Sequence, residues 1–297
     1  MYTSFNEEMK RRFGCKIYKL ALSGGMTCPT RDGTQGTRGC IFCSAHGSGD
    51  FAAPVCEIIS EQMEKAKQLV SKKAKDAKYI AYFQDYTNTY APVEYLQKLF
   101  YSAIEPDDIV ALSIGTRPDC LPDDVVELLS ELNKIKPVFV ELGLQTIHPQ
   151  TAEYIRRGYD LPVFDKAVKN LTDNGIEVVV HVILGLPGET REMMLQTVDY
   201  VGKSGAKGIK LQLLHVLEGT DLAEDYRQGR FETLDMDVYI DILTECLKIL
   251  PPDMVIHRLT GDGAKKELIA PLWSADKKRV LNEINRRLRE TVIQNKK

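Results

Sequence analysis

Three cysteines lie in one glycine-rich loop with the spacing C-x11-C-x2-C, directly after a strand-like apolar run at residues 16–23. Three thiolates are one fewer than a closed tetrahedral zinc site or a fully ligated [4Fe–4S] cluster needs. A [4Fe–4S] cluster held by Cys28, Cys40 and Cys43 would therefore leave one iron open for another ligand. This open position is the first chemical feature that the sequence predicts.

The composition of the loop suits a backbone that wraps closely around a cluster. Gly33, Gly36 and Gly39 can adopt dihedrals that other residues resist, and nearby N–H groups can donate to sulfur and tune the reduction potential. The alternative interpretation is a structural zinc loop in which His46 or Cys56 supplies a fourth ligand.

Short apolar runs alternate with amphipathic stretches along the rest of the chain. The apolar runs predict strands. The amphipathic stretches between them predict helices, several opened by proline or acidic residues. The predicted strands cover residues 16–23, 78–84, 109–114, 138–144, 176–184, 208–214 and 254–259, and the predicted helices cover residues 1–12, 55–75, 92–103, 122–134, 149–157, 162–173, 189–203, 235–250 and 276–292.

A strand followed by a helix, repeated about six times at spacings near 30 residues, predicts βαβ units and a parallel sheet of the α/β class. Right-handed crossovers would curl such a sheet into a barrel or leave it doubly wound. Both arrangements place ligand sites at the carboxyl ends of the strands, where the cysteine loop begins. We expect one domain over residues 1–297, with N- and C-terminal extensions and a basic helix at about 276–295.

Phe42, inside the Cys40-x-Phe42-Cys43 segment, makes the loop similar to the cluster loop of radical S-adenosylmethionine (SAM) enzymes. The long first spacing resembles the branch around the catalytic subunit of Elongator, and the whole chain resembles the YtqA/YhcC-type family. The resemblance implies a partial (β/α)6 TIM-like barrel with its core at about 16–260. It also implies a [4Fe–4S] cluster on the three cysteines, SAM on the open iron, and a 5′-deoxyadenosyl radical that abstracts hydrogen from the substrate.

The resemblance also implies which strand ends contact SAM, with departures from the family pattern. The paired glycines that usually precede Thr87 are absent, and Gly115 stands where relatives often place a glutamate. Alternatives stay open at three positions: Asp85 as a turn cap, Arg117 paired to Asp119, and His181 as a core residue. The implied SAM contacts are Asp85, Thr87, Thr116, Arg117, Gln145, Arg157, Gly185 and Leu186.

The substrate is expected at the later strand ends, which carry Lys210, Gln212, His215, His257 and Arg258. No Ser-His-Asp or paired-carboxylate signature is present, and the expected first chemical step needs no general acid or base. The roles of the histidines therefore stay open, and Trp273 is expected to pack against the terminal helix.

The formal net charge is −3, but basic residues gather before the cysteine loop and after position 276. Such clusters are the usual electrostatic footprint for a phosphate backbone, or else solvated helix faces. With the Elongator resemblance, they imply tRNA as the partner and the C5 side chain of a wobble uridine as the target. Carboxymethylaminomethyl would be trimmed to aminomethyl, because the chain has no room for the Elongator acetyltransferase domain.

Two other functions remain open: a radical SAM enzyme for a small metabolite, peptide or protein, and a zinc-stabilised RNA-binding module without catalysis. The radical chemistry implies an electron donor such as flavodoxin or ferredoxin. No apolar run approaches the roughly 20 residues of a membrane span. Residues 1–12 lack the apolar segment of a signal peptide, so we expect a cytoplasmic protein.

Overall fold

Eight strands form one parallel sheet in the order β1-β9-β7-β6-β5-β4-β3-β2. This computed structural model describes residues 2–45, 47, 56, 58–70, 77–261 and 265–294. The strands of the sheet are β1 (Thr3–Ser4), β2 (Ile17–Leu22), β3 (Lys78–Phe83), β4 (Ile109–Thr116), β5 (Val138–Gln145), β6 (Glu177–Leu184), β7 (Gly208–Leu213) and β9 (Val255–Arg258). The main helices are α1 (Phe5–Phe13), α2 (Ile59–Val70), α3 (Val93–Ile104), α4 (Asp123–Asn133), α5 (Pro149–Tyr154), α6 (Leu161–Asp173), α7 (Arg191–Lys203), α9 (Met236–Ile249) and α10 (Lys277–Gln294).

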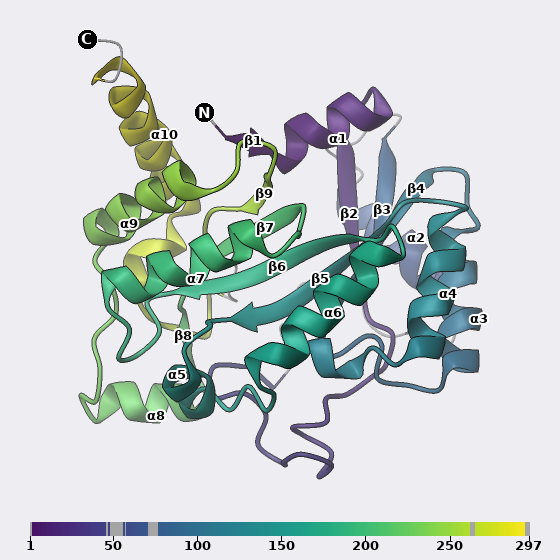
Figure 1. Ribbon diagram of the computed structural model, residues 1–297, viewed down its shortest axis with the longest axis horizontal. Coiled ribbons are helices and arrows are strands. Elements are labelled where there is room, and N and C mark those ends of the chain that lie inside the picture. The colour runs from purple at the N-terminus through teal and green to yellow at the C-terminus, as the bar shows by residue number, and fades with distance from the viewer. Residues whose placement is uncertain are drawn as a thin grey trace.

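The sheet is curled, with helices covering its outer face (Figure 1). The strands β2 to β7, each followed by a helical segment, are the predicted partial barrel. The partial (β/α)6 barrel is thus confirmed, and β9 and β1 extend its sheet beyond six strands.

The two faces of each strand carry different side chains, because successive residues of a strand point to opposite sides. The outward residues are aliphatic or aromatic and form one large buried cluster with the helices. Phe83, Leu112, Leu142 and Val180 are examples that are fully buried. Burying several such side chains, at about 1.5–3 kcal/mol each, stabilises the packing of the helices on the sheet.

Helix α1 closes the amino-terminal end of the barrel. Ser4 caps the helix through a reciprocal capping box with Glu7, and Gly14 ends it at φ 72°. Met9 of this helix packs against Ile17 and Phe139 in a separate buried cluster. The interior of the barrel is therefore filled at this end.

Some short elements were not predicted, because strands of two or three residues and a helix of seven are too short to show a clear period. β1 precedes α1 and pairs with β9, which adds the eighth strand. β8 (Val216–Leu217) pairs antiparallel with β10 (Leu268–Ala270), and helix α8 (Asp221–Arg227) follows β8. The predicted helix at 55–75 corresponds to α2, and residues 71–76 lie outside the described residues.

Many cations of the two basic clusters pair with acids of the same chain. Arg287 of α10 bridges to Asp237 and Asp241 of α9, and Arg286 pairs with Glu283 within α10. Before the cysteine loop, the cations Arg11, Arg12 and Lys19 all have carboxylate partners. The excess of positive charge that the sequence indicates is thus partly used to hold the fold together.

Trp273 packs against helix α9 and bonds to the segment before that helix, whereas the sequence predicted packing against the terminal helix α10. Its ring lies 5.7 Å from the ring of Tyr239, centroid to centroid, and its Nε1 donates to the carbonyl oxygen of Leu234 at 3.0 Å. In the part of the chain that the structure describes, no helix has both the length and the apolar character needed to cross a bilayer.

Candidate active site

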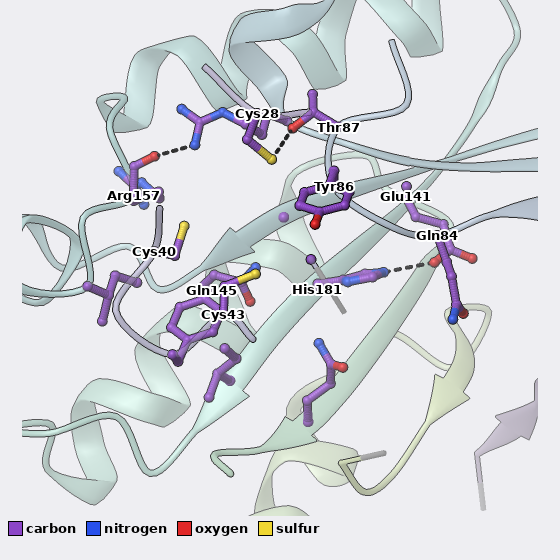
Figure 2. Close-up of a pocket in the computed structure, with 18 of the residues that line it drawn as sticks. Cys28, Cys40, Cys43, Gln84, Tyr86, Thr87, Glu141, Gln145, Arg157 and His181 are labelled. Carbon is purple, nitrogen blue, oxygen red and sulfur yellow. Dashed lines mark hydrogen bonds and ion pairs between the residues drawn. The ribbon is translucent and has the colours of Figure 1, made fainter. Parts of the chain in front are cut away.

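A pocket opens at the carboxyl ends of the strands, beside the cysteine loop. Its lining combines the three cysteines with residues from β3, β4, β5, β6, β7 and β9. Figure 2 shows Cys28, Cys40 and Cys43 at one side of this space and Glu141 at the other, with His181 between them. The topology therefore brings the predicted cluster ligands to the predicted end of the sheet.

The three thiols face the same space (Figure 2). The Sγ of Cys28 lies 3.0 Å from the hydroxyl of Thr87, and the Sγ of Cys40 donates to the carbonyl of Arg156 at 3.7 Å. Burial raises the pKa of Cys28, and it raises the pKa of Cys40 to about 12. Both thiols thus carry protons until metal ligation deprotonates them.

Contacts within the loop fix its shape. Arg31 reaches back and donates through Nη2 to the carbonyl oxygens of Cys43 at 3.2 Å and Ser44 at 2.8 Å. Gly39 has φ 70°, and a Cβ there would come within 2.8 Å of Nε of Arg31. Glycine is therefore required here, because both the dihedral and the space exclude a side chain.

Three thiols on one pocket are the donor set that a [4Fe–4S] cluster with one open iron needs. Among the described residues, no group of three or more His, Cys, Asp or Glu side chains is arranged to hold one ion. His46, one predicted fourth ligand for zinc, lies outside the described residues, and Cys56 has a contact from Nζ of Lys65 at 3.2 Å.

Five of the predicted SAM contacts line the pocket: Thr87, Thr116, Arg117, Gln145 and Arg157. Gln145 has φ 68°, which is strained for a residue with a side chain. Its Oε1 is buried and has no hydrogen-bond partner among the described residues. A buried acceptor without a donor costs free energy, so this atom is suited to receive a donor from a bound ligand.

Asp85, Gly185 and Leu186 are not among the described residues that line the pocket. Asp85 accepts from the hydroxyl of Ser23, and its other carboxylate oxygen is buried with no partner among the described residues. Gly185 has φ 89°, and Leu186 packs in a cluster with Ile41 of the cysteine loop. Their contact with SAM stays a prediction.

The two predicted arginines hold backbone and loops in place. Arg117 forms a two-pronged pair with Asp119, at 2.9 and 2.8 Å, which is the alternative that the sequence left open. Its other bonds reach the carbonyl of Arg157 at 2.8 Å and Gln35 of the cysteine loop at 3.0 Å. The guanidinium of Arg157 itself donates to three backbone carbonyls, those of Leu144, Thr146 and Tyr159.

Replacing Arg117 by lysine should destabilise the cysteine loop, because an ammonium cannot reproduce this planar set of bonds. We expect a loss of about 1–3 kcal/mol in the free energy of unfolding, with faster proteolysis between Cys28 and Cys43. Arg191→Lys is the matched control: it breaks an equally two-pronged but exposed pair with Glu245 and should cost at most about 1 kcal/mol. Equal losses in both variants would contradict a tethering role for Arg117.

The pocket floor is a layer of polar side chains that point into the barrel. At its centre lies Glu141 of β5, which is 1% exposed. One carboxylate oxygen accepts from Lys19 at 2.7 Å and Ser113 at 2.8 Å. The other oxygen accepts from Tyr82 at 3.0 Å, His181 at 2.8 Å and Lys210.

This arrangement sets the charges of the floor. Burial alone would raise the pKa of Glu141, but Lys19 and Lys210 outweigh it and hold the pKa well below its usual range. Burial lowers the pKa of His181 to about 4, so its ring is neutral at pH 7. Because a carboxylate only accepts, Nε2 of His181 carries the proton. The pKa of Lys210 is lowered to about 7, chiefly by burial.

The later strand ends predict Lys210 and Arg258 near the substrate, whereas the sequence assigns no role to Glu141 or Tyr82. His181 is held by the buried carboxylate of Glu141, as a core residue would be, and it also lines the pocket. A charged residue inside a strand that otherwise reads as apolar was the available signal, and Glu141 and Lys210 both have it.

Comparison with known proteins connects this site with a family. Residues 33–201 match the model of the Radical SAM superfamily, and residues 206–290 match the Radical_SAM C-terminal domain. Strands β7 and β9 lie in the second stretch and belong to the same sheet as the first.

The chain is 47% identical to the uncharacterized protein YtqA of Bacillus subtilis, covering 97% of this chain and 89% of YtqA. It is 37% identical to protein YhcC of Escherichia coli K12, covering 98% of this chain and 93% of YhcC. A tRNA uridine(34) acetyltransferase of Methanocaldococcus jannaschii is 31% identical over 52% of this chain and 28% of its own length.

Among solved structures, the archaeal Elp3 of Methanocaldococcus infernus with residues 1–46 deleted has a TM-score of 0.65 at 20% identity. The match covers 85% of this chain and 58% of the Elp3 chain. Methylornithine synthase has a TM-score of 0.56 at 13% identity, covering 84% and 67% of the two chains. These likenesses show a shared fold. The radical SAM family, whose model matches residues 33–201, implies a [4Fe–4S] cluster and SAM. Because of this match and of the relatives YtqA and YhcC, the chain belongs to the radical SAM superfamily of enzymes.

Proposed function

We propose that this enzyme modifies the C5 side chain of a wobble uridine in tRNA, converting carboxymethylaminomethyl to aminomethyl. In the balanced reaction the removed carboxymethyl unit leaves as glyoxylate, one water is consumed after the hydrogen transfer, and SAM is the two-electron oxidant that ends as methionine and 5′-deoxyadenosine. The observation that carries the proposal is the continuous pocket that joins the three thiols to a buried, cation-rich floor. Such a pocket suits a small charged group on a larger molecule, since the group can enter while the remainder stays outside.

The relatives supply the argument for the class of substrate. The M. jannaschii relative named as a tRNA uridine(34) acetyltransferase matches 52% of this chain. An Elongator complex protein 3 of Schizosaccharomyces pombe matches the same share at 27% identity. Position 34 of tRNA is the wobble position, so the name of the M. jannaschii relative supports a substrate at the same nucleotide.

The residues of this chain have distinct parts in the proposal. Cys28, Cys40 and Cys43 would hold the cluster, and Gln145 would offer its buried acceptor to SAM. When both cofactors are bound, they supply a radical able to remove hydrogen from an unactivated C–H bond. The protein orients the substrate and keeps water away. An electron donor such as flavodoxin or ferredoxin would reduce the cluster, and the cytoplasm is the expected compartment because tRNA is there.

The experiment compares tRNA that carries carboxymethylaminomethyluridine before and after incubation with anaerobically reconstituted enzyme, SAM and reductant. The nucleosides are separated and identified by mass spectrometry. We expect aminomethyluridine to appear with the wild type and not with Cys40→Ala. If the nucleosides stay unchanged while SAM is cleaved, the tRNA assignment is wrong and the radical chemistry stands.

One observation favours a second candidate, a radical SAM enzyme for a small metabolite, peptide or protein. Many cations of the two basic clusters are paired within the chain, which reduces the charge available for a phosphate backbone. Phosphate contacts make binding fall steeply with salt. Turnover that is insensitive to salt between 50 and 200 mM would therefore support the second candidate.

A further inference from the structure

The hydroxyl of Thr87 lies 3.0 Å from the Sγ of Cys28, a contact that the dashed line in Figure 2 marks. Thr87 is fully buried, and in the described part of the chain its hydroxyl makes no other hydrogen bond. Cys40 has a different neighbour, the carbonyl oxygen of Arg156 at 3.7 Å, which can only accept. The surroundings of the loop thiols are therefore unequal, with a hydroxyl placed at Cys28.

The direction of this hydrogen bond depends on the state of Cys28. A thiol and a hydroxyl can each donate, so either atom can be the donor while Cys28 is protonated. A cysteine that ligates iron is a thiolate and has no proton to donate. Thr87 is then the donor, and the sulfur of Cys28 is the acceptor that the described residues offer to its single O–H.

The backbone holds this hydroxyl in position. The N–H of Thr87 donates to the carbonyl oxygen of Thr27, the residue directly before Cys28, at 3.3 Å. Asn88 ties the same segment to β4, because its backbone N–H and its Nδ2 both donate to the carbonyl oxygen of Gly115, at 3.1 and 3.0 Å. Thr87 and Cys28 are thus fixed relative to each other by contacts that do not involve the sulfur.

We propose that Thr87 raises the reduction potential of the cluster by donating a hydrogen bond to the sulfur of Cys28. The reduced cluster carries one more electron than the oxidised cluster, so a donor to a ligand sulfur stabilises the reduced state more. Thr87 therefore makes the electron that starts the radical chemistry easier to supply. This role concerns the reduction that precedes any hydrogen transfer, so it goes beyond the proposed function and holds for either candidate substrate.

The test measures the midpoint potential of the reconstituted cluster without SAM, by a redox titration followed with electron paramagnetic resonance. Thr87→Val keeps the shape of the side chain and removes the donor. At a fixed potential, its ratio of reduced to oxidised cluster should be roughly three- to tenfold below that of the wild type, the size expected when part of one charge-assisted hydrogen bond is lost. A tenfold change corresponds to about 59 mV for one electron. Thr87→Ser keeps the hydroxyl and should restore the wild-type ratio.

Thr89→Val is the matched control. Thr89 lies two residues further along the same segment and is also buried, but its hydroxyl contacts that of Thr116 at 2.6 Å and the carbonyl oxygen of Cys120. The substitution removes the same group from the same segment without touching a loop thiol, so the potential should stay that of the wild type. An equal shift in Thr87→Val and Thr89→Val would show a structural effect and refute the proposal.

Other outcomes are equally decisive. A Thr87→Val cluster with the wild-type potential overturns the proposal, and so does a Thr87→Ser cluster that stays at the valine value. If Thr87→Val does not fold or does not hold its iron, Thr87→Ala removes the donor without adding volume and is titrated in its place. Because the titration uses neither SAM nor tRNA, its failure leaves the proposed function intact, and unchanged tRNA nucleosides leave the role of Thr87 intact.

Discussion

Replacing Cys28, Cys40 or Cys43 by alanine is expected to abolish both the cluster and the reaction. After anaerobic reconstitution, the wild type should hold about four irons per chain and absorb in the visible range. Each variant should lose the colour, most of the iron and all detectable SAM cleavage, because a cluster held by two thiolates lacks a ligand and the cofactor supplies the difficult chemistry. Iron analysis and quantification of 5′-deoxyadenosine check the prediction.

Cys15→Ala is the control, because Cys15 packs against the buried apolar residues that close the amino-terminal end of the barrel, opposite the cysteine loop. It should keep its iron and its activity. Full iron content in any one of the three loop variants would show that the missing residue is not a ligand. One tightly held zinc in place of iron would favour the zinc-stabilised module instead.

The order of strands and helices could be predicted because each is long enough to show its period. The strand at residues 176–184 reads as a nearly continuous apolar run, and β6 spans Glu177–Leu184. A strand in a parallel sheet is covered on both sides, which leaves few polar positions to confuse the pattern. Very short strands such as β1 and β8 lack this signal and are defined by their pairing partners.

The three cysteines that meet at the pocket could also be predicted, because a local spacing identifies them. The layer of polar side chains at the pocket floor could not be predicted. Glu141 is contacted by residues of β2, β3, β4, β6 and β7, which are scattered from Lys19 to Lys210 in the sequence. The curl of the barrel brings them together, and no local pattern records it. For the same reason, the sequence did not show that Arg12 and Arg287 have acidic partners on other elements.

Replacing Glu141 by glutamine should cost about 3–5 kcal/mol in the free energy of unfolding. Glutamine keeps the shape but removes the counter-charge, so Lys19 and Lys210 are left facing each other inside the barrel. Urea unfolding at pH 7 measures the loss. Glu283→Gln is the control, because it removes a carboxylate that pairs with Arg286 and Arg287 at the surface, and its effect should be far smaller.

The pH dependence gives a second readout on the same variant. The pKa of Glu141 is lowered on folding, so its stabilisation is complete above the usual value of 4.5 and is lost as the pH falls through the lower folded value. The gap in stability between wild type and Glu141→Gln should therefore be largest near neutral pH and shrink below pH 4.5. A gap that is constant with pH would show that charge is not the cause.

Combining Glu141→Gln with Lys210→Met should recover part of the lost stability. Removing one partner of a buried pair leaves an uncompensated charge, whereas removing both partners leaves a neutral gap that costs less. The double variant should therefore unfold at higher urea than Glu141→Gln alone, even though it has one more substitution. If the two losses of stability simply add, Glu141 and Lys210 do not interact. That result would contradict the ion pair of the structure, in which Glu141 is 1% and Lys210 3% exposed.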